Sequence, residues 1–427
     1  MSTLDAAHIA VVDLSFGDAG KGTTVDYLCS TKNVDLVVRF NGGPQAGHNV
    51  VLPDGRHHCF SMWGSGTLRG VPTYLSQFVA ISPERMDRER DALLDVGVRF
   101  PYSMMSIHED CLVVTPFHEA AQRRCSTTRG HGSCGSGFGE AVHLANQHPD
   151  GGGVLRAKHL RNYHLLVEHL EELGRLYDIK ADVRHLALNY YRWAHKVSIV
   201  DSEWFSRRVE ESLRRPDLTF VYEGAQGVLL DQDYGFHPYT TYSTTTFDNV
   251  TVLLDQVAER GAHMQGNLDL CRLGVLRSYT TRHGPGPFPS EVPIFPLDEE
   301  HNPTNRWQGV FRYGYWDRVA HQYAVDVARP DVLAVTHLDV KPNASEFVGM
   351  WRLDDAPFDP SIMDPADLEG RARQTEDIER ATALIHGWDW ADKAGAIEDL
   401  LRVPVVIESH GPTADDKKIR ESVSQMC

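Results

Sequence analysis

Two residues that could do chemistry, Asp18 and Lys21, lie in one glycine-rich turn near the start of the chain, in the stretch F-G-D-A-G-K-G. The mostly apolar run Ile9–Leu14 precedes the turn and predicts a buried parallel strand, and Thr23 can open a helix after it. A strand, a glycine-rich turn and a helix N-terminus direct several backbone N–H groups at one point, and the lysine adds a full positive charge there. The turn therefore suits a phosphate group.

The spacing of this turn departs from the ordinary phosphate-binding loop, G-x-x-x-x-G-K-[ST]. Ser15 takes the place of the first glycine, and Gly22 takes the place of the hydroxyl residue after the lysine. A carboxylate such as Asp18 is useful among phosphate-binding amides where a metal ion or a proton transfer needs it. The alternative is a plain strand-to-helix turn with a surface lysine.

A second glycine-rich loop, Asn41–Asn49, follows the predicted strand Val34–Phe40 and closes on His48. Glycines let the backbone approach a ligand closely, and a histidine can donate a proton or a hydrogen bond near pH 7. Taken alone, the histidine would belong to a hairpin turn on the surface. Two such loops at successive strand ends would share one edge of a parallel sheet, which favours a joint binding site.

Several later segments also place polar side chains after predicted strands or in loops that could wrap a ligand. Strands are predicted at Leu218–Tyr222, Val332–Thr336 and Val403–Glu408. The loop segments are Ser126–Gly139, Gly235–Thr246, Thr280–Pro289 and Arg306–Trp316. Asp339, just past a strand end, can accept hydrogen bonds from both N–H groups of a guanine base. The alternatives are a disordered surface loop at Ser126–Gly139, a threonine-rich strand surface at Gly235–Thr246, a packed surface loop at Arg306–Trp316 and a solvated loop aspartate at Asp339.

Amphipathic helices are predicted at Glu84–Val96, Leu155–Tyr177 and Leu186–Arg214. Strands that alternate with helices predict an α/β fold, with a large and mostly parallel central sheet flanked by helices. No internal repeat and no proline- or serine-rich linker divides the sequence. We therefore expect a single domain over residues 1–427, with helical and loop insertions.

The composition restricts the possible partners. With 42 basic and 59 acidic residues, the chain has a formal net charge of −17. This charge argues against a nucleic acid or an anionic membrane as the main partner, because both need a basic face. No apolar run approaches the roughly 18 residues of a membrane span, and no secretory signal is evident, so we expect a cytoplasmic protein. The seven cysteines include no C-x-x-C pair, which predicts reduced thiols.

Together these motifs resemble those of the adenylosuccinate synthetase family, whose members use GTP to join aspartate to C6 of IMP. The first turn is similar to that family's G-D-E-G-K-G, with Ala19 in place of glutamate, and Gly42–His48 is similar to its G-G-H-N-A-G-H loop. Four more motifs match in the family's order, at Glu223–Gly227, Tyr279–Glu291, Thr336–Val340 and Ser409–Pro412. The resemblance implies a P-loop-NTPase-like fold, a ligase that forms C–N bonds, GTP as co-substrate, Mg²⁺ as cofactor and a homodimer.

The resemblance also assigns catalytic roles. Asp18 matches the base that removes the N1 proton and binds Mg²⁺, His48 the donor to the transferring phosphate, and Lys21 the lysine on the γ-phosphate. Gln226 matches the amide that contacts the reacting ring. The carbonyl of Gly47 matches a second magnesium ligand.

The implied nucleotide site combines the first turn with two motifs from the C-terminal half. Its residues are Gly17, Gly20, Gly22, Thr23, His337, Asp339, Ser409, Gly411 and Pro412. Asp339 matches the residue that reads guanine, and His337 stands where the family has a lysine stacked on that base. The sequence leaves open whether this histidine keeps the preference for GTP or admits ATP.

Two substrate pockets depart from the family's pattern. The loop G-T-T-G-R-G-I-G-P, which helps bind the 5′-phosphate of IMP, reads G-S-C-G-S-G-F-G-E here. Cys134 thereby replaces a phosphate-binding threonine, Ser136 replaces an arginine, and Gln45 replaces an asparagine of the second loop. A charge-assisted contact is worth roughly 1.5–3 kcal/mol, so this change would weaken binding of such a phosphate.

The loop that binds aspartate differs as well. The family reads about G-A-T-T-G-R-[RK]-R-R-x-G-W, whereas Thr304–Tyr315 reads T-N-R-W-Q-G-V-F-R-Y-G-Y. The arginines that hold the carboxylates of aspartate become Gly309 and Phe311, although Arg306 could supply a replacement cation. The predicted substrate-binding residues are Gln45, Ser133, Cys134, Thr241, Arg306 and Arg312.

We therefore predict a divergent family member that phosphorylates a carbonyl oxygen and displaces the phosphate with an amine, acting on an altered acceptor and an altered amine. One alternative is a conventional adenylosuccinate synthetase in which Arg306 and Gln45 compensate for the changes. Another is a GTP-binding regulatory protein without ligase chemistry. The pair of Asp18 and His48 argues against the last, since binding alone needs no base.

Overall fold

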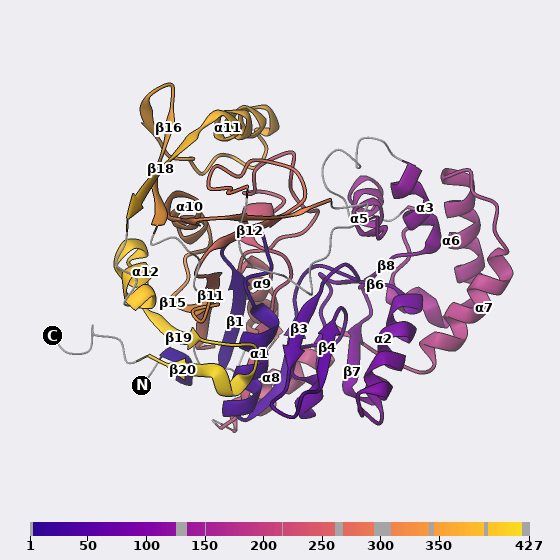
Figure 1. The fold of residues 1–427 in the computed structure, drawn as a ribbon. Coiled ribbons are helices and arrows are strands. Elements are labelled where there is room, and N and C mark those ends of the chain that lie inside the picture. Colours follow the sequence, from indigo (N-terminus) through magenta and orange to yellow (C-terminus); the bar gives the residue numbers. More distant parts are fainter. Residues whose placement is uncertain are drawn as a thin grey trace.

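A ten-stranded sheet runs through the middle of the molecule in the computed structural model, which describes residues 3–124, 135–149, 151–215, 217–260, 268–293, 309–340, 346–387 and 392–420 (Figure 1). In spatial order its strands are β20 (Lys417–Ile419), β19 (Val405–Ser409), β15 (Val332–Thr336), β11 (Leu270–Arg277), β1 (His8–Asp13), β10 (Thr219–Glu223), β2 (Val34–Arg39), β5 (Thr73–Leu75), β7 (Met105–His108) and β9 (Ser198–Val200). All neighbouring pairs are parallel except β19 and β20. The predicted α/β fold with a mostly parallel sheet is confirmed.

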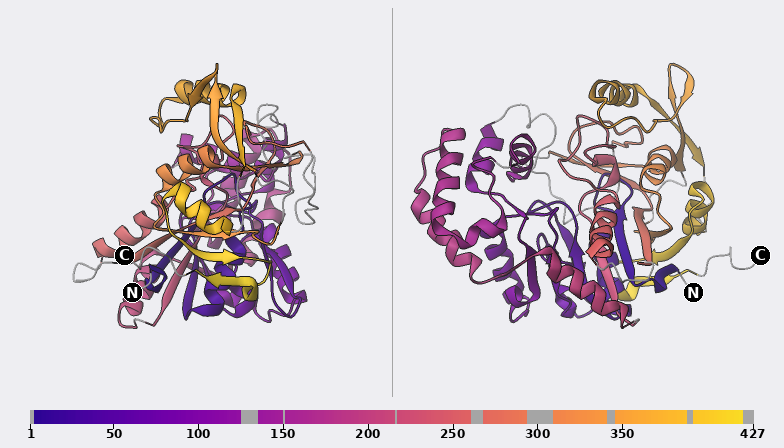
Figure 2. Two further views of the ribbon diagram at one scale, coloured as in Figure 1. Left: turned by 60° about the vertical axis from the view of Figure 1, so that its left-hand side comes forward. Right: turned by 180° about the vertical axis from the view of Figure 1, so that it is seen from behind.

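Helices flank this sheet, and further helices lie beyond one end of it. They are α1 (Lys21–Thr31), α2 (Pro83–Asp95), α3 (Pro116–Arg124), α5 (Phe138–Gln147), α6 (Tyr163–Leu176), α7 (Val183–Ala194), α8 (Ser202–Leu213), α9 (Asp248–Arg260), α10 (Arg318–Ala328), α11 (Leu368–Arg380) and α12 (Lys393–Leu401). Seen from behind, α6 and α7 form a helical lobe at one end of the molecule (Figure 2). Within the described ranges, no helix has both the length and the apolar character that a membrane span requires.

Strand β1 lies near the centre of the sheet because its sequence, H-I-A-V-V-D, can be buried on both faces. Ala10 and Val12 pack into a core that includes residues of α8, α9, α10 and α12. Ile9 and Val11 pack into a second core on the other face, which includes residues of α1. Apolar residues on both faces are typical of parallel strands covered by helices.

Smaller sheets surround the central one. They are formed by β3 (His48–Val51) with β4 (His57–Phe60), β6 (Ala80–Ile81) with β8 (Leu112–Val113), β12 (Thr280–His283) with β13 (Phe311–Gly314), and β14 (Trp316–Asp317), β16 (Glu346–Leu353), β17 (Ala356–Phe358) and β18 (Thr382–Gly387) together. The hairpin of β12 and β13 is antiparallel and opposes His283 to Phe311. It carries residues of the site described below.

The predicted bounds of helices and strands are accurate where a single element corresponds to a single continuous run of apolar periodicity. Strand β15 has the predicted bounds, Val332–Thr336, and α2 follows the predicted helix Glu84–Val96 to within one residue at each end. The prediction of one helical segment over Leu186–Arg214 is wrong, because the strand β9 separates α7 from α8 there. The single-domain organisation of residues 1–427 stays a prediction.

Candidate active site

One cavity of about 1040 Å³ lies at the carboxyl ends of the central strands. Its walls include the loops that follow β1, β2, β10, β15 and β19, so segments far apart in the sequence meet there. Polar side chains occupy the last position of β1, β10, β11, β15 and β19: Asp13, Glu223, Arg277, Thr336 and Ser409. Ligands of open α/β sheets bind at this edge, because the loops at the carboxyl ends can diverge around them.

The glycine-rich turn after β1 is held together by Asp13. Its carboxylate accepts hydrogen bonds from the backbone N–H groups of Ser15 at 2.9 Å and Ala19 at 2.8 Å. Lys21 donates its ammonium to the same carboxylate at 2.9 Å, and both side chains are buried. The backbone takes left-handed φ angles of 100° at Gly17 and 95° at Gly20, which glycine adopts without strain. The turn is thus built around a buried ion pair.

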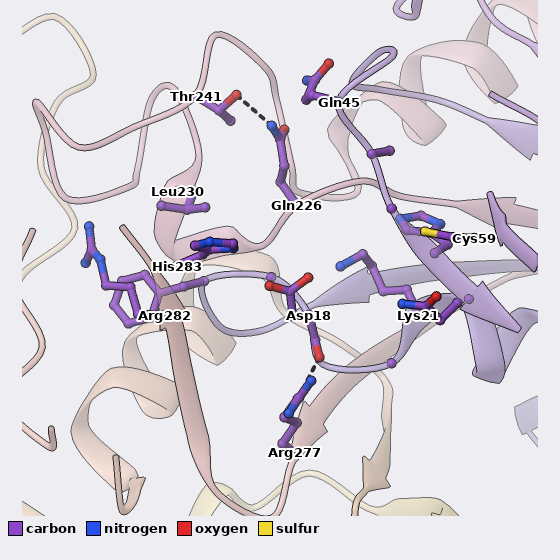
Figure 3. A pocket seen from close by; sticks show the side chains of 18 of the residues that line it. Asp18, Lys21, Gln45, Cys59, Gln226, Leu230, Thr241, Arg277, Arg282 and His283 are labelled. Carbon is purple, nitrogen blue, oxygen red and sulfur yellow. Dashed lines mark hydrogen bonds between the residues drawn. The ribbon is translucent and has the colours of Figure 1, made fainter. Parts of the chain in front are cut away.

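Asp18 projects its carboxylate from this turn into the cavity, with Lys21 on one side and His283 on the other (Figure 3). Its own φ of 61° is unusual for a residue with a side chain, and the guanidinium Nε of Arg277 donates to its carbonyl oxygen at 2.6 Å. Burial raises the pKa of the Asp18 carboxyl, although Arg277 and Lys21 oppose that rise. A raised pKa makes a carboxylate a stronger base, which suits proton abstraction.

His48 enters the cavity wall at the start of β3 and is anchored by a buried carboxylate. Its Nδ1 lies 2.6 Å from Oε1 of Glu223, and the backbone N–H of Ser65 donates to Oε2 at 2.9 Å. Burial alone would raise the pKa of Glu223, but His48, the charge of Arg39 and the hydroxyl of Ser65 lower it to about 2. Because Nδ1 is engaged by an ionised carboxylate, Nε2 is the imidazole nitrogen left for a ligand.

Two amide side chains line the cavity with unsatisfied atoms. Gln226, at a φ of 64°, donates through Nε2 to the hydroxyl of Thr241 at 3.0 Å. Its Oε1 is buried without a hydrogen-bond partner among the described residues, as are both amide atoms of Gln45. Buried polar atoms are usually hydrogen-bonded, so these atoms indicate a place for a ligand. The labelled side chains of Gln45, Gln226 and Thr241 are seen in Figure 3.

The C-terminal strand ends close the opposite end of the cavity. Thr23 donates its hydroxyl to the carbonyl of Pro412 at 2.9 Å and accepts from the ammonium of Lys417 at 2.6 Å. These bonds join the start of α1 to the loop after β19. His337 and Asp339 also line the cavity, and burial lowers the pKa of the His337 imidazole well below its ordinary value. The structure therefore brings the two halves of the predicted nucleotide site together.

A model of the adenylosuccinate synthetase family matches residues 10–416 of this chain. The chain belongs to the adenylosuccinate synthetase family. Its catalytic class is therefore that of an adenylosuccinate-synthetase-like C–N ligase. The predicted resemblance is confirmed, and this enzyme class with it.

Curated relatives match over nearly the full length. The adenylosuccinate synthetase of Syntrophobacter fumaroxidans is 28% identical over 458 residues, covering 97% of this chain and 99% of the relative. Adenylosuccinate synthetase 1 of Pseudoalteromonas translucida is 30% identical over 456 residues, covering 95% and 96%.

Two solved structures share the fold. The fully ligated adenylosuccinate synthetase of Plasmodium falciparum superposes with a TM-score of 0.79 at 20% identity, covering 97% of this chain and all of that one. The succinoaminodeoxyadenylate synthetase of cyanophage S-2L, bound to dGMP and to dATP as an energy donor, has a TM-score of 0.62 at 18% identity, covering 99% of this chain and 97% of that one.

Not every predicted substrate residue of this adenylosuccinate synthetase family member lies at the cavity. Arg312 is absent from the described lining. Its guanidinium instead donates to the carboxylate of Glu291 at 2.9 Å and to the carbonyl oxygens of Gly284 at 3.1 Å and Gly286 at 2.9 Å. Ser133, Cys134 and Arg306 fall outside the described residues. The substrate roles of these four residues stay predictions.

Sequence reasoning did not single out Asp13, Arg277 or His283, which the structure places in or under this family member's cavity. Burial lowers the pKa of the His283 imidazole, although Asp18 opposes that change. The only local signal for Asp13 was a charged residue near the end of an otherwise apolar strand. Arg277 and His283 reach the site through the pairing of β11 with β15 and of β12 with β13, which no local pattern reveals.

The donors present fit the magnesium ion that this family implies. Asp18 and Gly47 both line the cavity and offer oxygen ligands, which Mg²⁺ prefers. Among the residues that the structure describes, no three His, Cys, Asp or Glu side chains cluster as a metal cage. Mg²⁺ needs no such cage, because it keeps several waters and binds substrate phosphates through one or two carboxylates.

Proposed function

We propose that this protein is a GTP-dependent ligase that phosphorylates the carbonyl oxygen of a 6-oxopurine-like acceptor and lets an amine displace the phosphate. We further propose that its acceptor and its amine differ from IMP and L-aspartate. One observation supports the chemistry most directly: a candidate base, Asp18, lies in the same cavity as Lys21 and the anchored His48. Binding of a nucleotide alone would need no base.

The residues of the cavity suit the first half of this reaction, the phosphorylation of the acceptor. The oxygen of an amide-like carbonyl is a poor leaving group, so it must first be converted to a phosphate ester. Asp18 would remove the proton from the neighbouring ring nitrogen, which makes the oxygen nucleophilic toward the γ-phosphate; such general base action is worth on the order of 10²–10⁴ in rate. Lys21 and the N–H groups of the turn would stabilise the transferring phosphoryl group. His48 would join them as an imidazolium, donating from Nε2 while Glu223 holds its Nδ1–H.

Mg²⁺ held by Asp18 and the carbonyl of Gly47 would neutralise charge on the phosphates of the donor. Asp339 would read the guanine base, with His337 and the loop Ser409–Pro412 beside it. Homodimerisation and a cytoplasmic location belong to the same proposal, because they follow from family membership alone.

Changes in the acceptor end support altered substrates. Ser136 lies buried at the cavity wall, where the family's loop supplies an arginine for a 5′-phosphate. In the loop that binds the amine, Gly309 and Phe311 stand where the family has arginines. The cyanophage protein of the same fold is bound to dGMP, a purine nucleotide other than IMP. The 30% identity to an adenylosuccinate synthetase favours the conventional substrates as the second candidate.

Phosphate release tests the proposal. Purified protein is incubated with Mg²⁺, GTP or ATP, one acceptor from IMP, dGMP, inosine and small cyclic amides, and each standard amino acid in turn. We expect phosphate release from GTP that requires both an acceptor and an amine. The pair that supports it should differ from IMP with aspartate. Efficient turnover of IMP with aspartate would establish the conventional enzyme instead.

The Asp18→Asn variant separates catalysis from binding. It should lose turnover by about 10²–10⁴-fold, because the base is gone, while its affinity for GTP without Mg²⁺ stays close to that of the wild type. GTP binding without phosphate release from any combination in the wild type would favour the regulatory protein and refute the ligase.

A further inference from the structure

His283 occupies a place in the cavity wall that the family's pattern leaves open. It is the last residue of β12, and it corresponds to the variable position of the Y-S-T-R-x-G-A-G-P-F-P-T-E motif. Its ring nitrogen Nε2 is buried and has no hydrogen-bond partner among the described residues. Because buried polar atoms are nearly always hydrogen-bonded, an unpaired nitrogen at a cavity indicates a contact with a ligand.

The ring of His283 is held in a fixed orientation. Strand β12 pairs with β13 so that His283 opposes Phe311, and the two rings meet edge to face with centroids 5.5 Å apart and planes at 89°. The backbone of Gly309 hydrogen-bonds to the ring in the sense that favours a proton there. Since Nε2 has no partner, this bond falls on Nδ1, and Nε2 of the neutral ring is left as an acceptor.

The position of His283 relative to Asp18 indicates which substrate it meets. Lys21 and His283 lie on opposite sides of Asp18 (Figure 3). In the proposed reaction, Lys21 faces the phosphate donor and Asp18 faces the acceptor ring, so the remaining side is open to the third reactant. Leu230 lies on the same side of Asp18 as His283 (Figure 3), and it lines the cavity with an apolar side chain.

The neighbouring cation on this side is already engaged. Arg282 donates to the carbonyl oxygens of Pro285 at 3.0 Å and Pro287 at 2.7 Å, and its guanidinium lies 4.2 Å from the centroid of the Phe16 ring. It therefore serves mainly to hold the loop that follows β12. His283 is left as a hydrogen-bond acceptor that faces the third reactant.

We propose that Nε2 of His283 accepts a hydrogen bond from the nitrogen of the incoming amine and orients that nitrogen toward the acceptor carbon. This role rests on the proposed function. It makes His283 a determinant of specificity for the amine, since a ring nitrogen that accepts a hydrogen bond selects a reactant that carries an N–H group.

The test separates phosphorylation of the acceptor from attack by the amine. Exchange of the β–γ bridging oxygen of labelled GTP, measured with IMP, dGMP or inosine and no amine, reports the first step. Phosphate release with L-aspartate, glycine or hydroxylamine added reports the second. In His283→Val, we expect the KM for the amine to rise at least about tenfold and the ratio of amine-dependent release to exchange to fall at least about tenfold, as for one lost hydrogen bond.

Two further variants make the result specific. His283→Gln places an amide oxygen near the position of Nε2 and should recover part of the loss, which a merely structural role would not predict. His185→Gln, on the exposed face of α7, is the matched control. It should leave both the KM for the amine and the ratio of amine-dependent release to exchange unchanged. GTP affinity, measured for each variant, verifies that the fold is retained.

The outcomes distinguish this inference from the proposed function. Wild-type protein without exchange or release from these probes, or from any other acceptor and amine of the phosphate-release screen above, would refute the ligase, and this role with it. Exchange in the wild type together with unchanged amine kinetics in His283→Val would refute the role of His283 alone. A His283→Val protein that loses exchange in parallel with phosphate release would also refute the role in binding the amine, since the histidine would then act on the acceptor.

Discussion

His48 and Glu223 form a buried pair in which the imidazole Nδ1 lies 2.6 Å from the carboxylate Oε1. The two residues are 175 positions apart, one at the start of β3 and the other at the end of β10. Ser65 also holds the carboxylate, because its hydroxyl donates to Oε1 and its backbone N–H donates to Oε2. The orientation of the histidine at the cavity therefore depends on three separate segments of the chain.

The first prediction concerns this pair. Glu223→Gln keeps the size of the side chain but removes the charge that fixes the tautomer of His48 and stabilises a proton on it. We expect kcat to fall about 10²-fold, the lower end of what general acid–base groups contribute, with little change in GTP affinity. Steady-state kinetics and nucleotide titration measure the two effects separately.

Ser65→Ala is the control for the charge of Glu223. It removes one hydroxyl donor and leaves both the carboxylate and the backbone N–H of residue 65, so its loss of kcat should be much smaller. A Glu223→Gln enzyme with wild-type kcat would show that the pair serves only the packing of the sheet.

Segments whose residue pattern by itself determines their structure in the fold were predictable from the sequence. Strand β15 was predicted with its bounds because V-L-A-V is apolar and Thr336 ends the run, and all five residues are buried. The turn at Asp18 was predictable because its glycines supply left-handed angles at Gly17 and Gly20. Several such strand ends were expected on one edge of a sheet, and they do share one cavity.

Features that depend on distant pairing were not predictable. Strand β9 has only three residues, and it is a strand because it pairs with β7, so the helical pattern around it concealed the break between α7 and α8. The hairpin of β12 and β13 brings Glu291 to Arg312, which engages an arginine that the sequence suggested for substrate. The charge of Asp13 under Lys21 likewise appears only in three dimensions.

The second prediction explains why the first turn has a glycine where ordinary phosphate loops have serine or threonine. A Cβ added at Gly22 would lie 2.8 Å from Cβ of His48 and 3.1 Å from Oγ of Ser65. Gly22→Ala should therefore displace His48, lower the free energy of unfolding by about 1–3 kcal/mol as overpacking does, and reduce kcat. Denaturant unfolding and steady-state kinetics measure both changes.

Gly152→Ala is the matched control for this substitution. The added Cβ would meet only the flexible side chain of Glu172, at 3.2 Å from its Cγ, far from the cavity loops in the sequence. It should leave kcat unchanged. A Gly22→Ala protein as stable and as active as the wild type would mean that α1 can move away from β3 at no cost.

The third prediction concerns the pH dependence of stability at Asp317, which is 1% exposed. Its Oδ1 accepts from the backbone N–H of Val319 at 3.0 Å at the start of α10, and its Oδ2 accepts from the indole of Trp351 at 3.0 Å. Burial raises the pKa of this carboxyl to about 7, from 3.8 without the fold. The folded state therefore binds more protons than the unfolded state between these values, and the contribution of Asp317 to stability is lost as the pH rises through that range.

Asp317→Asn tests this sign, because asparagine keeps an oxygen acceptor for the start of α10 and cannot ionise. Relative to the wild type, its free energy of unfolding should improve by about 1–3 kcal/mol between pH 5 and pH 7, since a difference of one bound proton is worth about 1.4 kcal/mol for each step of one in pH. Urea unfolding at the two pH values measures the difference, and Asp255→Asn on the exposed face of α9 should give a curve parallel to that of the wild type. Parallel curves for Asp317→Asn and the wild type would mean that water reaches this carboxylate and keeps it ionised in the folded protein.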